Sequence, residues 1–424
     1  MSYFLINGGQ HLNGEINVRG FKNAATPILV ASLLSSQPSQ IENIPLIEDI
    51  FRMVELLESL GADVNWIEKR SLVVQSKFFN PEKINQNVIR QMRSSILLWG
   101  LLAAKCKEFQ TFSPGGCLIG ARSVETHLNA FRGLGWIVET DENGVYLFKR
   151  AKNWSDQDNR EIVLDEFSVT ATENLMIAAS TRPGQTKIEI AATDPSVQDL
   201  GKFLIKMGVR IKGLGTHTLI VRGQKKLKGV IHKIIPDPIE AGTFLLLGAA
   251  TKSSIVIKNA PTEYLLFPLK KIKEVGVNFS LAKNKIIVRP SHDFNSVKIQ
   301  TLPYPGFPTD LQAPTAVLLT QAKGVSLVYE VLYEGRFRYV QDLIKMGANI
   351  SISDPHQILI TGPTPLYGKE IKSYDLRAGA SLIIAALMAQ GESKIDDIYQ
   401  VDRGYEKIEE RLQKIGAEIK RVEE

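Results

Sequence analysis

The sequence predicts an α/β fold built from six repeats of about 71 residues, each with the element order βαβαββ. Three observations predict it. A glycine recurs after an amphipathic helical pattern, alternating strand patterns follow that glycine, and an apolar, alanine-rich helical segment precedes each amphipathic one. The recurring glycines are 68 to 74 residues apart: Gly61, Gly135, Gly208, Gly276, Gly347 and Gly416.

Each recurring glycine is expected to end a helix in the left-handed conformation, which glycine adopts without a Cβ penalty. The residues that follow alternate between apolar and polar, as in 209–212, which indicates a strand. Turn residues such as Lys283-Asn284 then lead into a second strand, as in 285–289. Every repeat therefore closes with a predicted strand pair.

The earlier half of each repeat contains a helical segment that is apolar on all sides, which predicts a buried helix. These segments begin near residues 23, 94, 172, 241, 313 and 378. Helices inside and strands outside would be the reverse of a barrel with an outer ring of helices. The periodicity alone leaves open whether the six repeats pair, form a ring or group into two domains of three.

Composition narrows the function classes. The net charge of +6 over 424 residues suits anionic ligands but is too small for a nucleic-acid-binding tail. Two cysteines cannot build a disulfide framework and indicate a reducing compartment. No signal peptide, membrane-spanning segment or metal-ligand spacing is evident, so we expect a cytoplasmic protein without a metal.

Charged or polar residues recur just before each inner helix, and they allow two interpretations. They could converge on one cleft, where helix N-termini bind anions, or they could be ordinary N-caps. Cations oppose the helix dipole at this end, so three of them suggest that an anion compensates them. The residues are Lys22 with Asn23, Arg93, Thr172 with Glu173, Asp237 with Glu240, Asp310, and Asp375 with Arg377.

A Pro-Gly-Gly turn at 114–116 places Cys117 on a loop, with Arg122 five residues later. A nearby cation lowers the pKa of a thiol, which favours a reactive cysteine. The alternative is a small buried hydrophobic residue, the interpretation we adopt for Cys106. Basic clusters at 333–338 and 401–406 could be either functional or solvated loops.

Several motifs together make the sequence similar to the enolpyruvyl transferase family, and within it to the members that act on UDP-N-acetylglucosamine. The resemblance extends over the whole chain, and its most specific parts are the cysteine loop and the first Lys-Asn pair. The motifs lie at 20–27, 114–122, 171–176, 375–378 and 402–406.

The resemblance implies a two-domain inside-out α/β barrel with three repeats in each domain, closing over substrates between them. One domain would comprise residues 1–22 and 232–424, and the other residues 23–231. The family reaction transfers the enolpyruvyl group of phosphoenolpyruvate to the 3′-hydroxyl of UDP-N-acetylglucosamine, in peptidoglycan precursor synthesis. It releases phosphate through a tetrahedral adduct and needs no cofactor or metal.

The resemblance also implies roles for individual residues. Asp310 would be the general base, and Cys117 the general acid and the site alkylated by fosfomycin. Lys22, Arg122 and Arg403 would bind phosphoenolpyruvate. The remaining substrate-binding residues would be Asn23, Arg93, Ser123, Val124, Glu125, Ser168, Val169, Thr170, Leu332, Arg336, Asp375 and Arg377. The expected assembly state is a monomer or a weak homo-oligomer, without nucleic-acid or membrane partners.

The sequence departs from the family pattern mainly on the nucleotide side. Ser123 and Glu125 replace a usual Pro and Asp, and Thr170 replaces a usual Gly. Phe21 occupies a position where the family usually has a small residue, and Pro238 a position where it usually has an Arg. The reaction type is therefore better supported than the nucleotide acceptor.

Alternative functions remain open at this point. An acceptor such as another UDP-sugar or shikimate 3-phosphate would keep the chemistry, although the cysteine loop argues against shikimate 3-phosphate. A ring-shaped nucleic-acid clamp needs the same basic stripe in every repeat, which the helix starts lack. A catalytically silent nucleotide-binding protein is disfavoured because both Cys117 and Asp310 are present.

Overall fold

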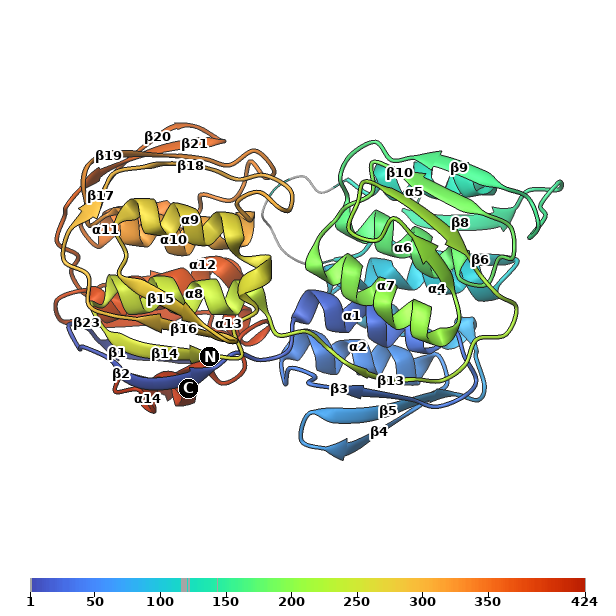
Figure 1. The fold of residues 1–424 in the computed structure, drawn as a ribbon, viewed down its shortest axis with the longest axis horizontal. Helices are drawn as coiled ribbons and strands as arrows, with labels where there is room; N and C mark the ends of the chain where they lie inside the picture. Colours follow the sequence, from blue (N-terminus) through green and yellow to red (C-terminus); the bar gives the residue numbers. More distant parts are fainter. Residues whose placement is uncertain (1, 116–119, 121–122, 143, 424) are drawn as a thin grey trace. The chain divides into compact units, whose positions relative to one another are not determined.

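The computed structural model describes residues 2–115, 120, 123–142 and 144–423, and its contacts divide the chain into two compact units. Unit 1 contains Met1–Arg19 and Pro236–Glu424, and unit 2 contains Gly20–Cys117 and Ser123–Ile235. Both units are α/β, as predicted. Figure 1 shows that in each unit the sheets lie around a set of inner helices.

The division lies a few residues from the predicted boundaries, because the connecting segments are bonded into unit 2. Strand β13 (Ile231–Lys233) pairs in parallel with β3 (Ser39–Glu42). The Phe21 N–H donates to the Ile235 carbonyl oxygen at 2.8 Å. Residues 20–22 and 232–235 therefore belong to unit 2, and the predicted boundaries at 22/23 and 231/232 need this correction.

The start of the chain forms two strands of unit 1. Strand β1 (Tyr3–Asn7) pairs antiparallel with both β23 (Glu392–Asp396) and β24 (Glu418–Val422). Strand β2 (Asn13–Asn17) pairs in parallel with β14 (Ser254–Lys258). The two ends of the sequence thus share one sheet.

The predicted buried helices are confirmed. In the described part of the chain, nearly every residue of the inner helices is buried, as their uniformly apolar composition requires. In unit 2 they are α1 (Lys22–Ser32), α4 (Leu98–Lys105) and α6 (Val169–Ala179). In unit 1 they are α8 (Pro238–Ala250), α10 (Gln312–Leu319) and α12 (Leu376–Met388).

The described residues form six sheets, and five of them share one arrangement, in which a parallel edge strand is followed by antiparallel strands. The sheet β6-β8-β7 is antiparallel throughout. The remaining strands of unit 2 are β4 (Ala62–Glu68), β5 (Ser71–Ser76), β6 (Glu108–Phe112), β7 (Trp136–Thr140), β8 (Val145–Arg150), β9 (Arg160–Val163), β10 (Thr186–Glu189), β11 (Arg210–Lys212) and β12 (Thr218–Arg222). Those of unit 1 are β15 (Phe279–Ala282), β16 (Lys285–Val288), β17 (Phe294–Asn295), β18 (Lys298–Gln300), β19 (Ala322–Tyr329), β20 (Asn349–Asp354), β21 (Gln357–Gly362) and β22 (Glu370–Lys372).

The outer helices end where the recurring glycines predicted. All six glycines have φ between 92° and 112°, so the expected left-handed helix ends are confirmed. The outer helices that end near these glycines are α2 (Glu48–Ser59), α5 (Glu125–Leu134), α7 (Pro195–Met207), α9 (Leu266–Val275), α11 (Val340–Lys345) and α14 (Ile408–Gln413). Two further short helices are α3 (Gln86–Ile89) and α13 (Tyr399–Asp402). Short 3-10 turns are η1 (Pro81–Lys83), η2 (Arg93–Leu97), η3 (Thr262–Tyr264) and η4 (Thr309–Leu311).

The predicted order βαβαββ occurs in three repeats and differs in three. In the fifth repeat, two short strands, β17 and β18, stand in place of the first strand. In the second repeat, helical turns stand in place of the first strand. Asn80 and Asn85 accept hydrogen bonds from backbone N–H groups two residues further on, which caps short helices. In the sixth repeat, β1 lies between β23 and β24, so the chain start supplies the strand that the chain end lacks.

Among the described residues, no helix is both long enough and apolar enough to cross a lipid bilayer.

Candidate functional site

The carboxylate of Asp310 is held by two arginines in unit 1. Asp310 lies in η4, just before the inner helix α10, and its side chain is 25% exposed. Arg336 donates to Oδ1, and Nε of Arg377 donates to Oδ2 at 3.0 Å. Both arginines are about 5% exposed. The structure therefore brings together three residues that the sequence predicted as site residues.

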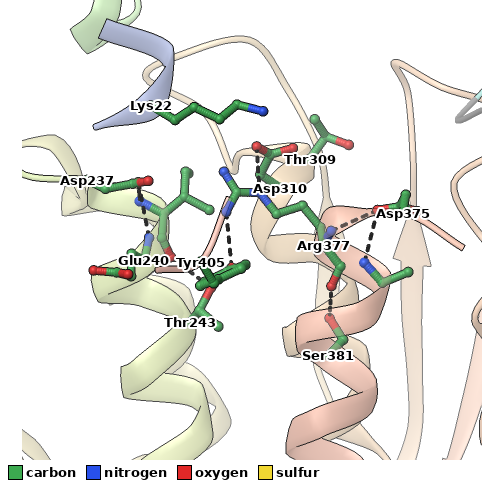
Figure 2. Close-up of polar contacts among 12 residues, drawn as sticks. Lys22, Asp237, Glu240, Thr243, Thr309, Asp310, Asp375, Arg377, Ser381 and Tyr405 are labelled. Carbon is green, nitrogen blue, oxygen red and sulfur yellow. Dashed lines mark hydrogen bonds and ion pairs between the residues drawn. The ribbon is translucent and has the colours of Figure 1, made fainter. Parts of the chain in front are cut away.

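Arg377 is positioned by the start of α12 (Figure 2). Asp375 is the N-cap, and its Oδ1 accepts from the backbone N–H groups of Arg377 at 2.8 Å and Ala378 at 3.0 Å. The guanidinium donates to the Tyr405 hydroxyl at 3.0 Å and lies 5.4 Å from the centre of that ring. Thr243 of α8 bonds the same hydroxyl at 3.0 Å, which fixes the tyrosine.

The electrostatics of this cluster keep a cation in a buried position. Burial by itself lowers the pKa of Arg377, but Tyr405, Asp310 and Asp237 together outweigh it and leave that pKa above its ordinary value. Burial raises the pKa of the Tyr405 hydroxyl, so the tyrosine stays neutral. A permanent cation beside a carboxylate can orient an anionic or hydroxyl-bearing ligand.

Asp237 acts as the N-cap of α8, where Oδ1 accepts from the N–H groups of Ile239 and Glu240. Burial raises the pKa of Asp237 to about 6, against the opposing effect of Arg377. Asp237 and Asp375 therefore both cap their helices, and the role of Asp375 toward a substrate stays a prediction. Asp310 instead bonds arginine side chains.

Two further predicted residues lie in the same unit. Arg403 is buried at the end of α13, and its guanidinium donates to Gln400 Oε1 at 3.3 Å. The Leu332 N–H donates to Oε1 of the buried Glu330 at 2.9 Å. Glu330 Oε2 accepts from the Thr309 hydroxyl at 2.7 Å, so this carboxylate ties the Leu332 segment to the turn that carries Asp310.

In unit 2, Lys22 begins α1 and pairs with Asp49 of α2, with 2.7 Å between Nζ and Oδ2. Asn23 follows in the same helix and is half-buried. Asp49 carries no signal in the sequence, because an acidic residue in the first turn of a helix is normally explained by the helix dipole.

Arg93 and the residues at the start of α5 also meet in unit 2. Arg93 begins η2, and its Nη2 donates to the Ser123 carbonyl oxygen at 3.2 Å. Ser123 Oγ accepts from the Glu125 N–H at 3.0 Å, and Val124 lies between them as the N-cap residue of α5. The Glu125 carboxylate pairs with Arg132 at 2.7 Å.

The second predicted nucleotide-binding segment lies beside the first. Ser168 is the N-cap of α6, which begins at Val169. The Thr170 hydroxyl lies 3.1 Å from Nε2 of His127, a residue of α5. This bond joins the starts of α5 and α6, and no sequence motif pointed to His127.

Cys117 and Arg122, the predicted acid and one of the predicted phosphoenolpyruvate ligands, lie outside the described residues. Their roles stay predictions.

Comparison with known proteins supports the resemblance. The model of the EPSP synthase (3-phosphoshikimate 1-carboxyvinyltransferase) family matches residues 6–412. UDP-N-acetylglucosamine 1-carboxyvinyltransferase from Halothermothrix orenii is 42% identical over the whole of both chains. UDP-N-acetylglucosamine 1-carboxyvinyltransferase 2 from Clostridium tetani is 41% identical, again over both whole chains.

Among solved structures, the enolpyruvyl transferase NikO from Streptomyces tendae has the same fold, with a TM-score of 0.89 over 99% of each chain at 22% identity. The family match, the full-length identity and the fold agree with one another. The chain therefore belongs to the EPSP synthase family of enolpyruvyl transferases.

Proposed function

We propose that this protein transfers the enolpyruvyl group of phosphoenolpyruvate to the 3′-hydroxyl of UDP-N-acetylglucosamine and releases phosphate. The observation that carries the proposal is the 42% identity, over both whole chains, to a relative named for this activity. The product is a precursor of peptidoglycan.

The reaction is an addition followed by an elimination. The sugar oxygen forms a bond to C2 of phosphoenolpyruvate, while C3 takes up a proton and the hydroxyl proton leaves. The tetrahedral adduct then loses phosphate from C2 and a proton from C3, which restores the double bond. The step therefore needs one group that accepts a proton and one that donates a proton.

Asp310 is the proposed proton acceptor for the sugar hydroxyl. Arg336 and Arg377 bond one oxygen each of its carboxylate, which orients the group. A carboxylate that is 25% exposed can reach a ligand, whereas the two arginines behind it are almost fully buried. The guanidinium group of an arginine is planar and rigid, so it suits the positioning of a carboxylate.

The remaining roles are assigned by matching the family motifs. Cys117 would donate the proton to C3. Lys22, Arg122 and Arg403 would bind the phosphate and carboxylate of phosphoenolpyruvate, because cations form strong charge-assisted hydrogen bonds to both groups. The residues proposed for the nucleotide sugar are Asn23, Arg93, Ser123, Val124, Glu125, Ser168, Val169, Thr170, Leu332 and Asp375.

The test is release of phosphate from phosphoenolpyruvate, measured with UDP-N-acetylglucosamine, with other UDP-sugars, with shikimate 3-phosphate and with no acceptor. We expect release only with UDP-N-acetylglucosamine. Release with another acceptor alone would replace the proposed acceptor, and no release from folded protein with any acceptor would refute the proposal. In the same assay, Cys117→Asp should stay active while losing inactivation by fosfomycin, because aspartate can still donate a proton but offers no thiol.

A further inference from the structure

A chain of buried hydrogen bonds in unit 2 ends at the hydroxyl of Thr170. The Gly100 N–H donates to Asn174 Oδ1 at 2.8 Å. Asn174 Nδ2 lies 3.0 Å from the Ile96 carbonyl oxygen and 3.0 Å from His127 Nδ1. His127 Nε2 then lies 3.1 Å from Thr170 Oγ1. Asn174 is 1% exposed and His127 is 3% exposed, so this series of hydrogen bonds is shielded from water.

The hydrogen bonds of Asn174 to Gly100 and Ile96 determine which atom donates in the remaining hydrogen bonds of the series. An N–H can only donate and a carbonyl can only accept, so Gly100 and Ile96 together fix which end of the Asn174 amide is oxygen. The amide nitrogen must then donate to His127 Nδ1, which makes Nδ1 an acceptor. A neutral imidazole with an accepting Nδ1 carries its proton on Nε2.

His127 Nε2 therefore donates to the Thr170 oxygen. A hydroxyl that accepts a hydrogen bond keeps its own proton for another acceptor, and Thr170 forms no second hydrogen bond within the described part of the chain. Thr170 is the second residue of α6 and is half-buried, so a ligand at the start of this helix can reach it.

We infer that Thr170 is a specificity-determining hydrogen-bond donor for the nucleotide substrate, held in that role by the positioning residues His127 and Asn174. The inference rests on the proposed function, which places the nucleotide against residues 168–170. The matching chemistry is an oxygen that only accepts hydrogen bonds, either in the diphosphate or as a carbonyl of the uracil ring. The hydroxyl would favour ligands that present such an oxygen there and disfavour those that present a donor.

The first experiment compares UDP binding by calorimetry, without phosphoenolpyruvate, in the wild type and in Thr170→Val, Thr170→Ser and Thr181→Val. Thr181 follows the opposite end of α6 and bonds the Ala104 carbonyl oxygen, so it is the matched control. We expect Thr170→Val to weaken UDP binding about tenfold, the effect of one hydrogen bond to a charged or polar oxygen. Thr170→Ser and Thr181→Val should bind as the wild type does.

Binding of uridine and UMP to the same variants identifies the acceptor. If Thr170→Val weakens uridine binding as well, the acceptor lies in the nucleoside, and if it weakens only UMP or UDP binding, the acceptor lies in the phosphates. Equal UDP binding by Thr170→Val and the wild type would overturn the inference. Because no turnover is measured, this outcome is distinct from failure of the proposed transferase activity in the phosphate assay.

The second experiment tests the positioning residues. Nitrogen-15 NMR of the wild type should show His127 with its proton on Nε2, and a proton on Nδ1 would overturn the relay. Asn174→Asp cannot donate to Nδ1 and places a carboxylate beside it, so the imidazole should gain a second proton at Nδ1 while Nε2 still donates to Thr170. We expect both ring nitrogens of this variant to be protonated and its UDP affinity to be retained, and a loss of affinity as large as that of Thr170→Val would contradict this account. Should the variant fail to fold, the wild-type NMR result decides the relay by itself.

Discussion

Arg377→Met is expected to destabilise unit 1 through the carboxylate that it leaves behind. Arg377 bonds Asp310 Oδ2 at 3.0 Å and the Tyr405 hydroxyl at 3.0 Å (Figure 2). Methionine fills a similar volume without charge. Asp310 would keep Arg336, and Tyr405 would keep Thr243. Asp310 would lose a directly bonded cation, and the buried Asp237 would lose a nearby cation.

The expected loss of stability in Arg377→Met follows from the burial of the ion pair. Removing one partner of a buried ion pair costs about 3–5 kcal/mol, because the other charge remains desolvated. Asp310 is 25% exposed and retains one arginine, which places the expected loss near the lower end, about 3 kcal/mol of the free energy of unfolding of unit 1. In an Asp310→Asn background the directly bonded carboxylate is already absent, and the same substitution should cost about 2 kcal/mol less.

The assay exploits the distribution of tryptophan. All four tryptophans of the chain, Trp66, Trp99, Trp136 and Trp154, lie in unit 2. Hydrogen exchange of peptides from α12 reports the stability of unit 1, while tryptophan fluorescence during urea unfolding reports that of unit 2. We expect faster exchange in α12 and an unchanged fluorescence midpoint.

The double-mutant cycle decides whether the reasoning is right. If the effects of Arg377→Met and Asp310→Asn on exchange in α12 simply add, the ion pair contributes nothing to stability and the account is refuted. A shifted fluorescence midpoint would show that the substitution acts on unit 2 as well, which a local ion pair cannot explain.

Two further predictions concern single carboxylates. Because burial raises the pKa of Asp237 to about 6, the folded protein binds a proton more tightly than the unfolded chain, and stability falls as pH rises from about 4 to about 6. Asp237→Asn keeps the cap without the charge, so urea unfolding should find it more stable than wild type above pH 6, by up to about 3 kcal/mol, and parallel pH profiles would contradict this. Asp49→Asn removes the negative charge beside Lys22 but keeps an oxygen acceptor. It should lower the Michaelis constant for phosphoenolpyruvate a few-fold at low salt and less at high salt, and an increase would show that the carboxylate is needed to position Lys22.

Much of the fold could be predicted because each repeat is determined by the same local features, a helix-ending glycine and a helix that is apolar on all sides. The glycine at position 208 ends a helix in the left-handed conformation for the same steric reason as its five counterparts. The all-apolar segment that became α8 could only be buried. What the sequence could not provide is pairing between distant segments, such as β1 beside β23 and β24, because no local signal specifies a partner about four hundred residues away.

The candidate site was predicted in part, and there is a physical reason why some of its residues could be predicted and others could not. Motifs identified Asp310, Arg336 and Arg377, and the structure shows that they bond one another. Motifs did not identify Asp49 or His127. Both act through a side-chain partner on another helix, and such pairs leave no trace in the spacing of residues along one element.

The helix-start cations prompted the argument that an anion must compensate them, and the structure shows that the protein supplies part of that compensation itself. Lys22 pairs with Asp49, and Arg377 pairs with Asp310. A lysine ammonium has three donors and an arginine guanidinium has five, so each can keep its internal carboxylate and still bond a second anion. The internal partner therefore does more than neutralise charge. It holds a flexible side chain in one direction before a ligand binds, which reduces the entropy lost on binding. For Arg377 this internal partner is Asp310, the group that is also proposed to accept the proton from the sugar hydroxyl.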